Sequence, residues 1–98
     1  MKFISTNPAT GVQIADYPEH SAAEVDAIVA TAHAAHRSWS ALPVSKRAEM
    51  LARLAQLLEE RADDYAALIV SEMGKPFAEA RGEVVKAAGG ARHFAENA

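Results

Sequence analysis

The sequence contains no cysteine, which excludes disulfide bonds, thiolate zinc ligands and a cysteine nucleophile within these 98 residues. An absence of cysteine is typical of proteins from a reducing compartment. No run of apolar residues approaches the ~18 that a membrane-spanning helix requires, so no membrane contact is expected. Residues 1–5 are followed at once by polar residues, unlike the apolar stretch of a signal peptide. We therefore expect a cytoplasmic location.

A clustered positive surface is also missing. The chain carries 10 Lys and Arg residues against 13 Asp and Glu residues, for a net charge of −3. Nucleic-acid backbones require a concentrated basic surface. The densest candidate, formed by Lys46, Arg47 and Arg53, is interrupted by Glu49 and is better explained as a solvated helix face. We expect no nucleic-acid partner.

Large apolar side chains are fewer than the overall composition suggests. Half of the residues are apolar, but 23 of these 49 residues are alanine. Alanine favours helix strongly, yet each alanine removes little surface from water when it is buried. The composition therefore predicts well-formed helices with a thin core, and such helices need a larger surface to pack against.

The N-terminal residues 1–20 are predicted to form a β-hairpin arm. Two short extended segments within residues 3–17 flank the stretch Asn7-Pro8-Ala9-Thr10-Gly11. Proline fixes φ and glycine tolerates positive φ, so this stretch should reverse the chain direction. Because a lone hairpin is only marginally stable in water, its edges should lie on other structure.

Residues 21–98 are predicted to form a four-helix segment, which makes the fold class mostly α with an N-terminal β-hairpin. Ser21 and Glu24 have the spacing of a capping box at the start of the first helix. Gly74 is suited to end the third helix, and Pro76 to open the fourth. The expected helices cover about residues 21–41, 45–60, 62–73 and 76–97. The second and third could instead form one helix with a kink near Arg61.

Apolar residues recur at helical spacing on one face of each predicted helix, and in the third helix this face is expected to be the buried side. They include Val25, Ile28, Val29 and Trp39 in the first helix, and Tyr65, Leu68, Ile69 and Met73 in the third. Gly89 and Gly90 interrupt the fourth helix, where each internal glycine costs roughly 1 kcal/mol relative to alanine. We expect another backbone to approach closely there.

Two glycine motifs do not fit nucleotide-binding loops. Gly74-Lys75 lacks the earlier glycine of a phosphate-binding loop, because Ile69 stands at that position, and Pro76 replaces the required Ser or Thr. Gly89-Gly90 lacks the G-x-G-x-x-G pattern that follows a strand. Helix termination and helix packing explain the two motifs better.

Metal ligands and acid–base groups are not arranged convincingly. His33 and His36 share a helix face, but no third ligand has a suitable spacing. The carboxylate pairs Glu59-Glu60 and Asp63-Asp64 lie on polar faces beside Arg61, whereas catalytic carboxylates need a cleft that shifts their pKa. We predict no catalytic residue and no cofactor-binding residue in this chain.

Two stretches in a fixed order carry a resemblance to a known family. Asn7-Pro8-Ala9-Thr10-Gly11 opens the chain, and Glu72-Met73-Gly74-Lys75-Pro76 follows much later. With the helical sequence between them, the chain resembles the N-terminal region of the aldehyde dehydrogenase superfamily. The Glu-Met-Gly-Lys-Pro form and the final Ala95-Glu96-Asn97-Ala98 resemble bacterial succinate-semialdehyde dehydrogenases most. The glycine pair at 89–90 and His93 depart from the pattern of many relatives.

The resemblance implies a piece of a much longer enzyme that oxidises aldehydes to acids with NAD or NADP. In that family a cysteine thiolate attacks the aldehyde, hydride passes to the nicotinamide, and a glutamate-activated water releases the acid. All of these groups lie downstream, so no cofactor is expected to bind to this chain alone. Residues 21–98 would be an incomplete part of the cofactor-binding domain, in its outer helical layer.

The resemblance also implies partners and one ion site. The remainder of the dehydrogenase chain and further copies in a homo-oligomer would cover this segment. Some family members hold a structural monovalent cation, which here would use the Thr6 backbone carbonyl, the Glu72 carboxylate and a group downstream.

Our leading hypothesis is a structural, catalytically silent N-terminal segment of an NAD(P)-dependent aldehyde dehydrogenase, acting on an aldehyde such as succinate semialdehyde. The chain ends within a helical pattern at Ala98, which we interpret as an interruption. The alternative is a stand-alone helical module that binds a partner or self-associates through exposed apolar faces.

Overall fold

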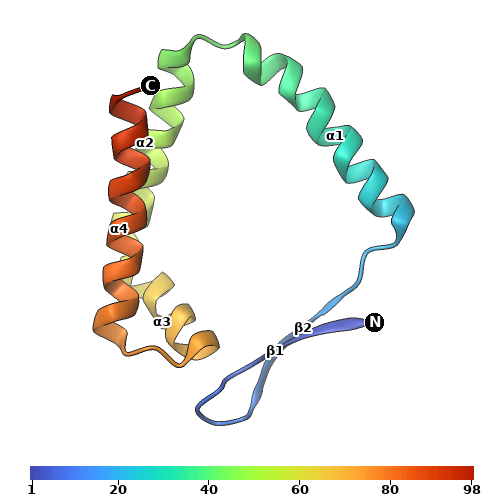
Figure 1. The fold of residues 1–98 in the computed structure, drawn as a ribbon, viewed down its shortest axis with the longest axis vertical. Helices are drawn as coiled ribbons and strands as arrows, with labels where there is room; N and C mark the ends of the chain where they lie inside the picture. Colours follow the sequence, from blue (N-terminus) through green and yellow to red (C-terminus); the bar gives the residue numbers. More distant parts are fainter.

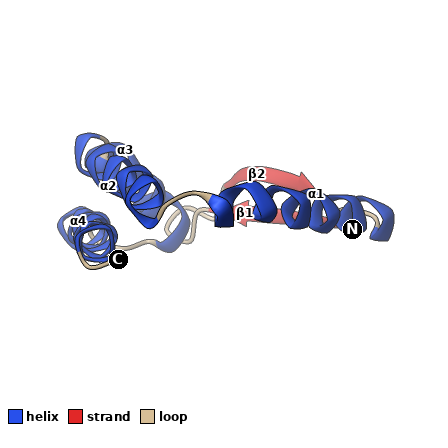
Figure 2. Cartoon of the chain, turned by 90° about the horizontal axis from the view of Figure 1, so that it is seen from above, coloured by secondary structure: helices blue, strands red, loops and turns tan.

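A computed structural model describes residues 1–98 and contains two strands and four helices, in the order β1, β2, α1, α2, α3, α4. The fold is mostly α with an N-terminal hairpin, as predicted. α2 and α4 lie side by side, α3 turns away below them, and α1 is a separate limb that connects them to the hairpin (Figure 1). Figure 2 shows α1 and the hairpin together on one side, apart from α2, α3 and α4.

The hairpin consists of β1 (Lys2–Thr6) and β2 (Gln13–Pro18), which pair antiparallel with one irregularity after Ser5. Its turn is organised by Asn7, whose side-chain oxygen accepts hydrogen bonds from the amides of Ala9 (2.9 Å) and Thr10 (3.3 Å). Gly11 adopts a φ of 72°, a conformation that glycine tolerates without steric cost. The turn residues of the sequence therefore reverse the chain as expected.

Helix α1 (Ala22–Ala41) begins with a complete capping box. The Ser21 hydroxyl accepts from the Glu24 amide (3.2 Å), and the Glu24 carboxylate accepts from the Ser21 amide (2.7 Å). That amide, followed by the Ser21 side chain, lowers the pKa of Glu24 below its ordinary value of 4.5. The cap matters more than usual here, because α1 has no extensive contact with another element.

Replacing Ser21 with alanine is expected to reduce the helicity of α1. A lost N-cap costs about 1 kcal/mol, and an isolated helix of this length is marginal in water. Because the carboxylate of Glu24 has a lowered pKa in the helix, its contribution is present at neutral pH and is lost as the pH falls below about 4.5. Far-ultraviolet circular dichroism against pH should show this acid transition weakened in Ser21→Ala. Ser38→Ala, in the same helix, should keep it.

Helices α2 (Val44–Glu60) and α3 (Ala62–Met73) are separate, because Arg61 leaves helical geometry at φ −111° and ψ 21°. α2 starts one residue earlier than predicted, since the Pro43 carbonyl already accepts from the amides of Lys46 and Arg47. α4 (Phe77–Glu96) is one residue shorter than predicted at each end, with Pro76 as its N-cap residue. None of the helices is both long and apolar enough to cross a membrane.

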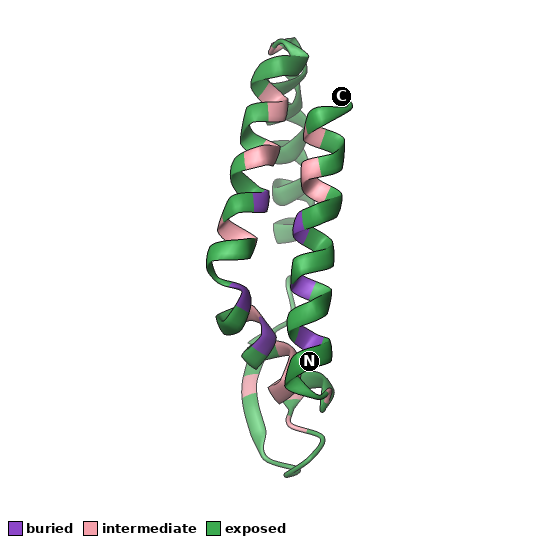
Figure 3. Cartoon of the chain, turned by 90° about the vertical axis from the view of Figure 1, so that its left-hand side faces the viewer, coloured by how far each residue is buried: buried purple, intermediate pink, exposed green.

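The core is as thin as the composition predicts. Six residues are buried, and they lie where α4 faces α2 and α3 (Figure 3). They are Ala55, Ala62, Ala66, Ala80, Val84 and Ala88. Small side chains allow the helices to approach closely, but each buries little apolar area.

Large apolar side chains are exposed on two helices. All of α1 is exposed, including Val25, Ile28, Val29 and Trp39, as expected of a helix that needs a larger surface to pack against. On α3, Leu68 and Met73 were predicted to be buried but are 58% and 72% exposed. That prediction was wrong because the hydrophobic period marks a face that can be covered, and no other part of this chain covers it.

The chain as a whole is open. Its radius of gyration is 17.5 Å, whereas a compact domain of this length has one of about 13 Å. Its accessible surface is 7300 Å², about 1,900 Å² more than a folded monomer of this mass exposes. That excess is roughly twice the ~800 Å² that each partner contributes to a standard protein–protein interface.

The glycine pair of α4 also faces open space. A side chain added at Gly89 or Gly90 would meet no atom within 4 Å. The predicted close approach of another backbone is therefore not made by any part of residues 1–98.

Candidate functional site

The two motifs that carry the family resemblance meet at one place, which we call the hairpin junction (Ser5, Pro8, Glu72 and Gly74). The Ser5 hydroxyl of β1 donates to a carboxylate oxygen of Glu72 near the end of α3, at 2.6 Å. Pro8 in the hairpin turn lies against Gly74, where an added Cβ would be 3.0 Å from the proline ring. These contacts bring the two motifs, which are far apart in the sequence, together in space.

Gly74 ends α3 in the left-handed conformation, with φ 67°, and its amide donates to the Val70 carbonyl at 3.0 Å. It is a helix C-terminus, as the sequence predicts, and not a phosphate loop. The next residue, Lys75, forms an ion pair with Glu83 of α4. The hydrogen bond to Glu83 raises the pKa of Lys75, and the pair links the α3–α4 turn to α4.

The cation site predicted at Thr6 and Glu72 falls at the same junction. The Glu72 carboxylate accepts a hydrogen bond from Ser5, and Ser5 is the residue before Thr6 in β1. Carbonyl and carboxylate oxygens are the donors that hard cations prefer. No group of three or more His, Cys, Asp or Glu side chains occurs at the junction or elsewhere in the chain.

The surface contains an open groove of about 580 Å³, which we call the α2–α4 groove. Eight of its nine lining residues are apolar, and Arg47 is the exception. The lining comprises Trp39, Val44, Arg47, Ala48, Met50, Leu51, Leu54, Phe94 and Ala98. An apolar groove of this size on a small chain marks a surface suited to binding another apolar surface.

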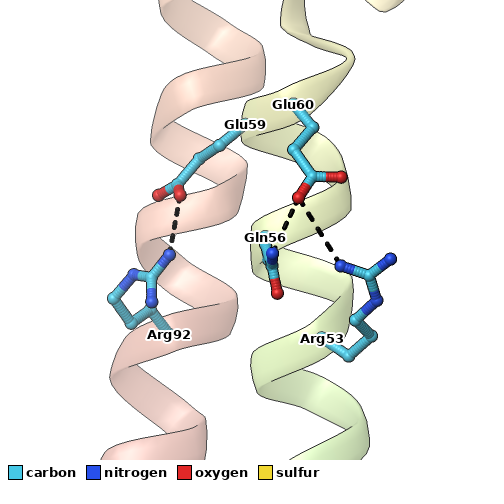
Figure 4. A network of polar contacts seen from close by, with 5 residues as sticks. All are labelled: Arg53, Gln56, Glu59, Glu60 and Arg92. Atoms are coloured by element: carbon cyan, nitrogen blue, oxygen red, sulfur yellow. Dashed lines mark hydrogen bonds and ion pairs between the residues drawn. The ribbon is translucent and has the colours of Figure 1, made fainter.

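The paired carboxylates of α2 belong to exposed ion pairs, as Figure 4 shows. Glu59 pairs with Arg92 of α4 at 2.8 Å, which raises the pKa of that arginine. Glu60 pairs with Arg53 at 3.6 Å and accepts a hydrogen bond from Gln56. Exposed pairs of this kind contribute little to stability. The same carboxylates line a small open hollow of about 140 Å³ together with Asp63, Asp64 and Arg81, and their pairing with exposed arginines agrees with the solvated role predicted.

The histidines do not form a site together. His33 and His36 are exposed on α1, and no group of three or more potential metal ligands occurs. The His93 ring contacts Phe94 edge to face, with centroids 5.4 Å apart.

Arg47 is less exposed than predicted. With Lys46 and Arg53 it was expected to lie on a solvated face, but the Nε atom of Arg47 is buried without a hydrogen-bond partner. A signal was present in the sequence, because Arg47 precedes Leu51 and Leu54 by four and seven positions. Arg47 therefore lies on the apolar stripe of α2.

Comparisons with known proteins agree with the motifs. The model of the family described as "Aldehyde dehydrogenase family" matches residues 1–98. Succinate-semialdehyde dehydrogenase (NADP(+)) of Deinococcus radiodurans is 40% identical over 94 residues, which cover 96% of this chain and 20% of that protein. 3-Sulfolactaldehyde dehydrogenase of Pseudomonas putida is 42% identical over 96 residues, which cover 98% of this chain and 20% of that protein.

Solved structures show the same relation. An aldehyde dehydrogenase from Brucella melitensis biovar abortus superposes with a TM-score of 0.93 at 38% identity, covering 98% of this chain and 20% of that one. An NADP-dependent glyceraldehyde-3-phosphate dehydrogenase from Bacillus halodurans, complexed with NADP, superposes with a TM-score of 0.93 at 34% identity, again covering 98% and 20%. The chain spans about a fifth of the length of the proteins it matches.

Proposed function

The chain belongs to the aldehyde dehydrogenase family, and from this premise we propose that residues 1–98 are the N-terminal structural segment of an NAD(P)-dependent dehydrogenase. The observation that carries the proposal is the full-length match of the chain to one fifth of its relatives. The open shape supports it, because the thin core leaves apolar faces that a larger domain would cover.

The proposed reaction is the oxidation of an aldehyde to a carboxylic acid with NAD or NADP, and succinate semialdehyde is our proposed substrate. Similar proteins are named for succinate semialdehyde, glutarate semialdehyde and 3-sulfolactaldehyde. By their chemistry these are short aldehydes with an anionic group at the other end. The cofactor and substrate would bind to the complete enzyme, since residues 1–98 contain no cysteine to act as the nucleophile of such an oxidation.

Within that enzyme the segment would cover one side of the cofactor-binding domain. We further propose a cytoplasmic homo-oligomer and a monovalent cation between Thr6 and Glu72 at the hairpin junction. The Ser5–Glu72 hydrogen bond supports the ion site, since it fixes the carboxylate beside β1.

Residues 1–98 alone are expected to give no turnover with succinate semialdehyde and either NAD or NADP, measured by the absorbance of the reduced nicotinamide. A chimera is the matched test: this segment replaces the equivalent fifth of the Deinococcus radiodurans enzyme. The chimera should be soluble and active, while the same enzyme without the segment should not. Turnover by residues 1–98 alone, or activity in the enzyme that lacks the segment, would contradict the proposal.

A second function is favoured by the exposed apolar face of α1. As a stand-alone module, the chain would bind a partner helix or a second copy through that face. A cooperative thermal transition in a defined small oligomer, as measured by sedimentation and circular dichroism, supports this function. A monomer of low stability, or an aggregating chain, that becomes stable in the chimera supports the dehydrogenase segment.

A further inference from the structure

Arg47 is placed unlike the other cations of α2. It lies among apolar side chains in the α2–α4 groove, and its Nε atom is shielded from solvent with no acceptor in reach. A buried guanidinium N–H group that lacks a partner is costly, because it has given up its water without a replacement. The groove is therefore one hydrogen-bond acceptor short of a satisfied surface.

The two cations nearest to Arg47 on α2 both have partners. Lys46 pairs with Glu49 at 3.1 Å, and Arg53 pairs with Glu60 at 3.6 Å. Arg47 forms no ion pair in this chain. Both of the paired cations are exposed, whereas the unpaired one is half-buried. The missing acceptor must come from whatever fills the groove.

We propose that the α2–α4 groove receives an apolar segment from the dehydrogenase chain outside residues 1–98, and that this segment sets one Asp or Glu carboxylate against the Arg47 guanidinium. The proposal rests on the proposed function. About four fifths of the length of the relatives lies outside the matched region, so the occupant belongs to the same enzyme. Eight apolar lining residues require an apolar occupant, and one cation requires one anion.

A carboxylate fits Arg47 better than a neutral acceptor does. Guanidinium and carboxylate form short, charge-assisted and frequently bidentate pairs. A buried cation beside a neutral carbonyl would keep its charge uncompensated in a low-dielectric groove. Arg47 is thus a positioning residue, which fixes the register of the segment on α2 and α4.

The test uses four versions of the Deinococcus radiodurans chimera: the unchanged segment, Arg47→Met, Arg47→Lys and Arg47→Gln. Methionine keeps most of the volume but removes the donors, lysine keeps the charge, and glutamine keeps a neutral donor. Soluble yield and residual activity after heating are measured for each version. Arg53→Met is the control, because Arg53 is an exposed cation on the same helix.

We expect Arg47→Met and Arg47→Gln to lower the yield of active chimera several-fold, Arg47→Lys to retain most of it, and Arg53→Met to change little. In residues 1–98 alone, Arg47→Met should not lower the free energy of unfolding, because no carboxylate of that chain pairs with Arg47 and none is left unpaired by the substitution. Full yield of active chimera from Arg47→Met would overturn the proposal. Full yield from Arg47→Gln would also overturn it, because it would show that the acceptor facing residue 47 is neutral and is not a carboxylate.

Two further outcomes separate the possible failures. If Arg47→Met destabilises the isolated chain and dissociates a dimer of it, the occupant is a second copy and the proposal is overturned. If the chimera with the unchanged segment is inactive, the proposed function fails before the Arg47 variants are compared.

Discussion

Val84→Asp is expected to separate α4 from α2 and α3 and to abolish the cooperative unfolding of residues 1–98. Val84 is 5% exposed and is the largest side chain in a core otherwise made of alanine. A carboxylate at this position would be buried without a partner, at a cost of about 4 kcal/mol. That cost is close to the whole stability expected for a small domain with little apolar burial. Thermal unfolding followed by circular dichroism measures the effect.

The next residue supplies the control. Val85 is 44% exposed on the same helix, so Val85→Asp has the same chemistry and nearly the same position without burial. Its effect should stay within about 0.5 kcal/mol. Equal melting curves for Val84→Asp and Val85→Asp would show that α4 does not pack on α2 and α3 in solution.

Gly74→Ala is the second large effect, with an expected loss of about 2 kcal/mol. A side chain at a φ of 67° is strained, and its Cβ would lie 3.0 Å from the Pro8 ring. A loss of 1 kcal/mol lowers the midpoint temperature of thermal unfolding by several degrees in a domain of this size, so the midpoint should fall by about 10 °C. The same substitution should loosen the hairpin, as measured by its protease sensitivity.

Two matched variants divide this effect into its causes. Gly82→Ala has neither a positive φ nor a close neighbour, so it should raise stability by about 1 kcal/mol through helix propensity. Pro8→Ala in the Gly74→Ala background removes the contact atom and should recover part of the loss. If Gly74→Ala and Gly82→Ala shifted the midpoint in the same direction, the assignment of Gly74 as a strained helix end would be wrong.

The local chemistry of the sequence determined the elements of this protein. The Ser21–Glu24 capping box, the Asn7 turn and the Gly74 helix end each act within a few residues, so their side chains specify the local backbone wherever the rest of the chain lies. The order of the two family motifs likewise indicated the aldehyde dehydrogenase family before any contact between them was known.

Only the tertiary structure decided which faces are covered and which side chains meet. Helical periodicity indicates that α1 has an apolar face, but burial depends on a neighbour, and α1 has no extensive contact with another element of residues 1–98. The Ser5–Glu72 hydrogen bond joins positions 67 residues apart, and the unpaired Nε of Arg47 follows from the packing of α2. Contact and desolvation are properties of surfaces brought together in space, and no single stretch of sequence contains both surfaces.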